Sequence, residues 1–110
     1  MRIVVKTDCY NPRRDGRPWI CRVTSWPIGA PKPEIVWGSW VGARPGSEGQ
    51  LVIEAQEGDL IRWGQNDMRS HNHTYRTYAI VGPDGALTEI DATRACEYAQ
   101  TQLVGHGNAQ

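Results

Sequence analysis

Several features that mark common protein classes are missing from this sequence of 110 residues. The apolar run at its start is too short for a signal peptide, and no segment approaches the length needed to cross a membrane. The 12 acidic and 12 basic side chains cancel, so the chain has no long-range field to attract nucleic acid or an anionic membrane. We therefore expect a cytoplasmic protein without membrane contact, in which any binding depends on local groups.

Signatures of cofactor and metal chemistry are missing as well. The sequence has no glycine-rich phosphate loop, and its three cysteines show no C-x-x-C spacing. We interpret the cysteines as free thiols in a reducing compartment, with a disulfide between Cys9 and Cys21 as the alternative. These absences predict no cofactor and no enzymatic activity. A small metal- or thiol-dependent enzyme remains as a second alternative function.

The aromatic and basic residues are unevenly chosen. The chain contains no Phe but five Trp and four Tyr, and it has ten Arg against two Lys. Trp, Tyr and Arg are the commonest anchors at protein interfaces, where Lys is depleted. A GC-rich genome would also favour Arg over Lys. Because five Trp are hard to bury in so small a domain, we predict that one or two are exposed, with Trp26 and Trp40 as candidates.

Short alternating segments between turn signals predict a mainly β protein, at the margin of α+β. The expected strands span residues 2–6, 19–26, 34–41, 50–55, 60–63, 75–81 and 86–90. A helix at 92–103 should follow an N-cap at Asp91. We predict one domain over residues 1–104 and a flexible tail at 105–110. Its fold should be a small antiparallel β-sandwich or barrel of about six to seven short strands with one C-terminal helix.

The side-chain patterns of two expected strands, the one within 57–67 and the one at 34–41, predict which of their faces are buried. In the segment 57–67, around which we expect the fold to be organised, Ile61 and Trp63 should face one way and Arg62 the other. The strand at 34–41 has apolar side chains on both faces, which indicates a central strand or one whose outer face is covered by a partner. Gly38 in this strand indicates a bulge or a close backbone approach.

The loop between the first two strands is the first candidate site. It combines cationic and aromatic side chains: Tyr10, Arg13, Arg14, Arg17 and Trp19. Such a mixture could hold a phosphate and a base, and arginine forks bind the carboxylates of an acidic protein surface equally well. A solvated loop, in which Asp8 and Asp15 offset the arginines, is the third interpretation.

The polar loop at 65–74 is the second candidate site and carries Arg69, His71 and His73. Two histidines at this spacing can share a metal ion, with Asp67 and Cys9 as further candidates, but a site needs a third and usually a fourth ligand. The sequence nearby does not supply them. We therefore predict no metal and assign this loop to a contact with a partner.

Certain segments resemble a known group of sequences. The segment 6–14 reads KTDCYNPRR and is followed by GRPW at 16–19, while 58–65 reads GDLIRWGQ ahead of an Asp84-Gly85 hairpin. Over residues 2–98 the chain resembles small uncharacterised proteins encoded by phages and integrated mobile elements of Gram-negative bacteria. These motifs carry no known chemistry, so the resemblance implies no catalytic residue. It implies a context in which small accessory proteins often act by binding a host protein, including components of CRISPR or other defence systems.

Composition and resemblance together predict a non-enzymatic, protein-binding accessory protein of a phage or mobile element. It would act as a stoichiometric inhibitor of a bacterial host system such as CRISPR-Cas, in the manner of an anti-CRISPR. The predicted partner-binding residues are Tyr10, Arg13, Arg14, Arg17, Trp40, Arg69, His71 and His73. The first alternative is a small nucleic-acid-binding module that uses the same arginine-rich loop. No oligomeric state is predicted.

Overall fold

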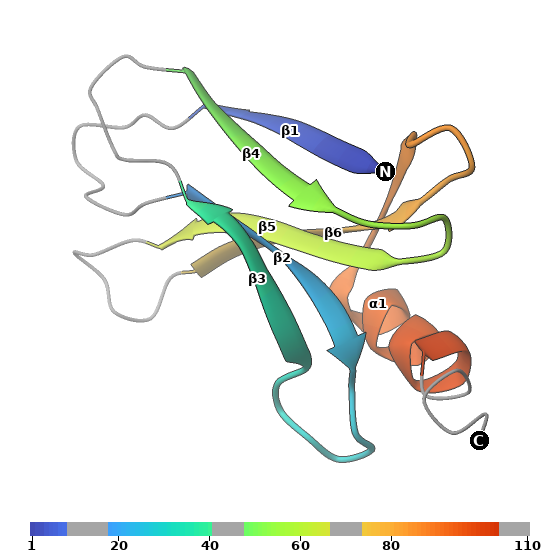
Figure 1. Ribbon diagram of the computed structural model, residues 1–110. Helices are drawn as coiled ribbons and strands as arrows, with labels where there is room; N and C mark the ends of the chain where they lie inside the picture. Colours follow the sequence, from blue (N-terminus) through green and yellow to red (C-terminus); the bar gives the residue numbers. More distant parts are fainter. Residues whose placement is uncertain (9–17, 41–47, 67–73, 104–110) are drawn as a thin grey trace.

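The computed structural model describes residues 1–8, 18–40, 48–66 and 74–103 (Figure 1). Its strands are β1 (Arg2–Asp8), β2 (Pro18–Ser25), β3 (Glu34–Trp40), β4 (Glu48–Glu54), β5 (Leu60–Asn66), β6 (Thr74–Val81) and β7 (Leu87–Ile90). Strands β1 and β4 form one sheet, and the others form a five-stranded sheet in the order β3-β2-β5-β6-β7. All pairings are antiparallel. The predicted mainly β fold is confirmed as a two-sheet sandwich.

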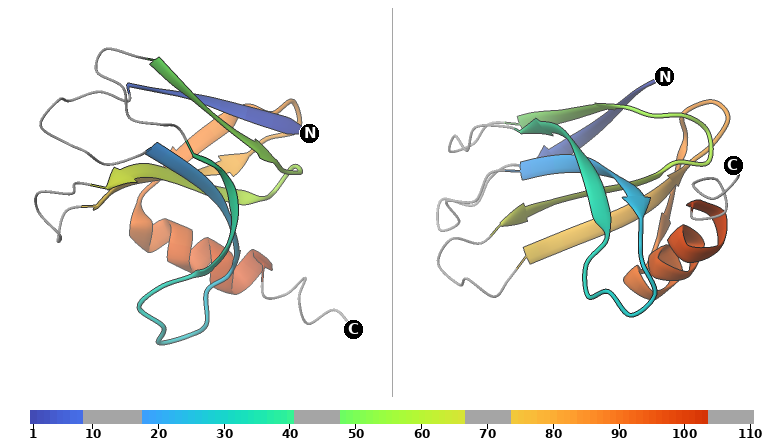
Figure 2. Two further views of the ribbon diagram at one scale, coloured as in Figure 1. Left: turned by 60° about the vertical axis from the view of Figure 1, so that its left-hand side comes forward. Right: turned by 60° about the horizontal axis from the view of Figure 1, so that its bottom comes forward.

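The five-stranded sheet is the middle of three layers (Figures 1 and 2). The β1-β4 sheet covers one face, and the other face is covered at one end by the helix α1 (Ala92–Tyr98) and the π-helical turn η1 (Ala99–Leu103). The helix begins as predicted, because the Asp91 carboxylate accepts a hydrogen bond of 2.8 Å from the backbone N–H of Arg94. Ala95 and Ala99 are fully buried where the helix packs on the large sheet.

Two hydrophobic cores result from this arrangement. The first core fills the space between the sheets and contains Ile3, Val5, Ile20, Leu51, Ile53, Ala55, Ile61, Ala79 and Val81. The second core lies between the large sheet and the helix and contains Val23, Trp26, Leu60, Tyr78, Ala95 and Ala99. Strand β5 contributes to both cores because Ile61 faces the first and Leu60 the second. Trp63 packs on the first core beside Ile61, so the predicted alternation along this strand is confirmed.

Strand β3 lies at the edge of the large sheet, so the first interpretation of its two apolar faces, a central strand, is wrong. Its close approach at Gly38 is confirmed. A Cβ atom at this position would lie 3.0 Å from Ile20 Cγ2 and 3.0 Å from Ile53 Cβ. Just beyond Gly38, the backbone N–H of Val52 in β4 donates a 2.6 Å hydrogen bond to Ser39 Oγ, which joins the two sheets at this end.

Of two expectations about side chains, one is wrong and one is confirmed. Trp26 is buried, because a turn after β2 lets its indole N–H donate a 3.1 Å hydrogen bond to the Ala30 carbonyl while its ring packs 6.1 Å from Tyr78. The interpretation of the cysteines as free thiols is confirmed for Cys21, which is buried, and for Cys96, so the alternative disulfide of Cys21 is not formed. Within the parts of the chain that the structure describes, no helix is long and apolar enough to span a membrane.

Candidate functional site

Of the aromatic and basic residues in the two candidate loops, the structure fully describes only Trp19, which is buried in β2 at 3% exposure, so its expected place in an open binding loop is wrong. The predicted partner-binding residues cannot be compared with this geometry. Seven of them lie outside the described residues: Tyr10, Arg13, Arg14, Arg17, Arg69, His71 and His73. Of Trp40, the structure describes only the backbone at the end of β3. The tail at 105–110 also falls outside the described ranges. The described residues nevertheless contain three other features that bear on function.

The first feature is the exposed apolar surface of the edge strand β3. Val36 is 46% exposed and Trp37 is 50% exposed, although both lie in the middle of the strand. Val36 pairs with Arg22 of β2 and Trp37 pairs with Cys21, so the two side chains occupy opposite faces of the sheet. Strand β3 therefore presents apolar groups to solvent on both faces at an edge.

The second feature is a buried arginine on the face that carries Trp37. Arg62 of β5 lies directly opposite Cys21 of β2 and is only 8% exposed. Its guanidinium carbon lies 5.1 Å from the centre of the Trp19 ring, a cation–π contact. Among the described residues, no acceptor meets its buried Nε and no carboxylate lies within ion-pair distance. Arg62 is thus a buried cation without an anion among these residues.

Considering the described residues alone, this arrangement of Arg62 is energetically unfavourable. An ion taken out of water loses several kcal/mol even after the protein relaxes around it. The cation–π contact with Trp19 returns about 0.5–2 kcal/mol, which offsets only part of that loss. A second arginine, Arg76, is exposed nearby and also has no described carboxylate partner. Burial raises the pKa of the Cys21 thiol. The charge and hydrogen bonding of Arg62 and the charge of Arg76 oppose this rise, so both guanidinium groups lie close enough to Cys21 to affect its ionisation.

Replacing Arg62 with methionine should therefore stabilise the fold. Arg62→Met keeps an unbranched side chain of similar length in the packed position and removes a buried charge that no described carboxylate compensates. We expect the free energy of unfolding to rise by about 1–3 kcal/mol, measured by urea denaturation. A matched control is Arg94→Met on the exposed side of α1, which should change stability by less than about 0.5 kcal/mol. A clear loss of stability in Arg62→Met would mean that the cation is already compensated.

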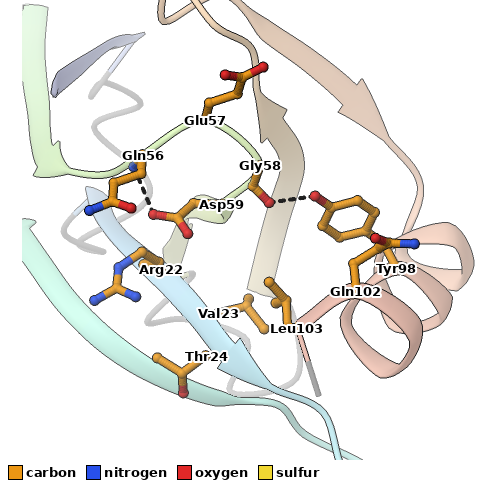
Figure 3. A pocket seen from close by; sticks show the side chains of 10 residues that line it. All are labelled: Arg22, Val23, Thr24, Gln56, Glu57, Gly58, Asp59, Tyr98, Gln102 and Leu103. Atoms are coloured by element: carbon orange, nitrogen blue, oxygen red, sulfur yellow. Dashed lines mark hydrogen bonds between the residues drawn. The ribbon is translucent and has the colours of Figure 1, made fainter. Parts of the chain in front are cut away.

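The third feature is a cleft of about 560 Å³ between β2, the turn before β5 and the C-terminal helix (Figure 3). Residues that line it are Arg22, Val23, Thr24, Gln56, Glu57, Gly58, Asp59, Tyr98, Gln102 and Leu103. The Tyr98 hydroxyl donates a hydrogen bond to the Gly58 carbonyl, and the Asp59 carboxylate accepts one of 2.8 Å from the Gln56 N–H. Burial, and then the charge of Asp59, raise the pKa of Tyr98. These bonds hold the wall of the cleft in place.

The charges around this cleft have mixed signs. Arg22 also lines two adjoining hollows of about 340 Å³ and 380 Å³, and none of the described carboxylates pairs with it. Glu57 and Asp59 nevertheless place negative charge in the same cleft. No group of three or more His, Cys, Asp or Glu within the described ranges could hold a metal ion. The cleft is large enough for a small ligand, but its polar groups do not select one chemical class.

Comparison with known proteins does not assign this chain to a family. No family model matches the chain, and the searches of curated proteins and of solved structures find no similar protein. The resemblance to phage and mobile-element proteins stays a prediction.

The sequence contained a signal for Arg62 that our interpretation did not use. A charged side chain stands in the middle of an apolar strand, between Ile61 and Trp63, and alternation places it on the face opposite to both. Residues of this kind are rarely buried unless they are paired. The pattern predicted the direction of Arg62. It did not predict that the second face of β5 would also be covered, because only the tertiary structure brings Trp19 and Tyr78 against it.

Proposed function

We propose that this protein acts without catalysis, by stoichiometric binding to another protein, and that the edge strand β3 is part of the contact. The observation that carries this proposal is the pair of adjacent apolar side chains, Val36 and Trp37, each about half exposed on an edge strand. Of the two interpretations of β3 offered by the sequence, a strand covered by a partner is the one that an edge position supports.

Edge strands of monomeric proteins are normally protected against association by charged side chains, prolines or bulges. Strand β3 begins with the charged Glu34, and its register against β2 shifts between Glu34 and Ile35 and again between Trp37 and Trp40. The stretch between these shifts, which contains Val36 and Trp37, has no charged side chain, no proline and no bulge. Tryptophan is also among the residues that contribute most to binding energy at protein interfaces. A partner that covered Val36 and Trp37 would remove apolar surface from water and protect the edge at the same time.

The resemblance to phage and mobile-element proteins supports a bacterial protein in the cytoplasm as the partner. In that context the protein would act as a stoichiometric inhibitor of a host system such as CRISPR-Cas. The loop that carries Arg13, Arg14 and Arg17 and the loop that carries His71 and His73 would extend the contact beyond β3.

The proposal can be tested by capture from a Gram-negative lysate followed by reconstitution with the purified captured protein. We expect a complex of defined stoichiometry in light scattering. Trp37→Ser should weaken it at least about thirtyfold and Val36→Ser by a smaller factor, because buried tryptophan anchors typically contribute 2 kcal/mol or more, roughly thirtyfold in affinity.

Val4→Ser is the matched control for Val36→Ser, because Val4 is 44% exposed on β1 of the other sheet. It should leave the affinity unchanged. The proposal is wrong if no protein is retained reproducibly, or if the complex tolerates Trp37→Ser as well as it tolerates Val4→Ser.

A further inference from the structure

We infer that the partner presents an acidic segment, and that its Asp or Glu carboxylates pair with Arg62 and Arg76 beside Trp37. This inference rests on the proposed function and specifies the chemistry of the partner. It assigns a binding role to a part of the sheet, the Arg62 face, which we define by Trp19, Trp37, Arg62, Gly64 and Arg76.

The strand register places these side chains together. Arg62 lies opposite Cys21 on one side and Tyr78 on the other, while Arg76 lies opposite Gly64, two residues along β5 from Arg62. Diagonal neighbours of this kind are about 7–8 Å apart, within reach of long side chains. Trp19 of β2 and Arg76 of β6 both pair with Gly64 of β5. Because glycine has no side chain, β5 places no side chain between Trp19 and Arg76.

The neighbouring core determines from which side a partner can approach. Leu60, one row further along β5, is fully buried beneath the C-terminal helix, and Tyr78 is 4% exposed beside Arg62. Access from that end is therefore closed by the second core. Arg76 is exposed at the opposite end, and Trp37 is half exposed on the flanking edge strand.

Charge complementarity favours a carboxylate as the group that the described residues do not supply. Two guanidinium groups lie near each other, and none of the carboxylates in the described ranges forms an ion pair with either. One carboxylate between them would relieve their mutual repulsion and compensate the buried charge of Arg62. Guanidinium groups hold carboxylates through paired, charge-assisted hydrogen bonds, and the half-exposed Trp37 ring provides adjacent apolar contact.

Phosphate groups of a nucleic acid would also satisfy an arginine, but the observations favour a protein. The whole chain has a formal net charge of zero, so it provides no extended positive field along which a phosphate backbone could lie. The Arg62 face is also continuous with the exposed apolar edge of β3. A mixed apolar and cationic surface of this kind matches an acidic protein segment that carries apolar residues.

The first test uses a blocked oligoglutamate peptide, titrated at low salt and monitored by tryptophan fluorescence, since Trp19 lies against Arg62. We expect saturable binding that weakens with added salt and is reduced at least about tenfold by Arg62→Met and by Arg76→Gln. Arg94→Gln, on the exposed side of α1, should bind as the unaltered protein does. Because Arg76 is exposed, its variant tests the inference even if Arg62→Met does not fold.

Three outcomes would overturn the inference. The first is that oligoglutamate does not bind, and the second is that it binds equally to the Arg62→Met and Arg76→Gln variants. The third is that oligothymidylate binds more tightly through the same two arginines, which would identify a phosphate ligand instead. The captured partner provides a separate test. A complex that requires Trp37 but tolerates both arginine variants would overturn the acidic segment and leave the proposed function intact.

Discussion

Replacing Ile61 with alanine is expected to lower the free energy of unfolding by about 2–5 kcal/mol. Ile61 is fully buried in the first core, where side chains from both sheets surround it. Alanine would remove most of its buried apolar surface and leave a cavity that the surrounding strands can close only in part. Urea denaturation monitored by tryptophan fluorescence and by circular dichroism would measure the loss.

The adjacent residue on β5, Leu60, provides a comparison that tests whether the two cores unfold together. Leu60 is equally buried but faces the second core, so Leu60→Ala should cost a similar amount by damaging the helix-covered side. Because one strand contributes to both cores, we expect both variants to unfold in a single transition. Ile28→Ala is the control, since Ile28 is 92% exposed in the turn after β2 and should change stability by less than about 0.5 kcal/mol. Loss of the helix signal before loss of the β-sheet signal in the circular dichroism of Leu60→Ala would show that the cores are independent.

The second large effect is expected at Gly38, where there is no room for a side chain. Gly38→Val should lower the free energy of unfolding by about 2–3 kcal/mol. Even the first added carbon would lie 3.0 Å from Ile53 Cβ, an atom attached directly to the backbone of β4 that cannot turn away. Strands β3 and β4 must separate to accept it, which strains the hydrogen bond from the Val52 N–H to Ser39 Oγ.

A graded series separates this steric effect from backbone preference. Gly38→Ala should cost less than Gly38→Val, although valine is the better strand former, because only valine carries the two further methyl groups. Gly29→Ala provides a contrast. Nothing lies within 4 Å of the added carbon there, and its cost would come from the backbone φ of 81° alone. If valine at position 38 were more stable than alanine, the close approach between the sheets would not be real.

The expected effects at Arg62 and at the core positions have opposite signs. Core residues such as Ile61 stabilise the fold by burying apolar surface, and shortening them should destabilise it. Arg62 is buried without an anion among the described residues, so its removal should stabilise the free protein and weaken the complex. A residue that reduces stability in isolation and gains compensation on binding is what a recognition role predicts. A purely structural residue would show both effects with the same sign.

Much of the fold could be predicted from local patterns. Alternation and turn residues placed every strand within a few residues of its observed bounds, and Asp91 marked the start of the helix. These succeeded because a period of two along a strand and a capping side chain at a helix depend on neighbours in the sequence. Gly38 was likewise recognised as a bulge or a close approach, since an apolar strand rarely contains glycine without such a reason, and the structure shows the close approach.

The sequence by itself determined that the chain is mainly β, that β5 has an apolar face and an arginine on the other, and that β3 has apolar groups on both. Only the tertiary structure decided that β3 lies at an edge, that Trp26 is buried while Trp37 is half exposed, and that Arg62 is covered without an ion pair from the described residues. The physical reason is that alternation fixes the direction of a side chain relative to its own strand. What covers that side chain depends on strand order and on the packing of a second layer, which join residues far apart in the chain.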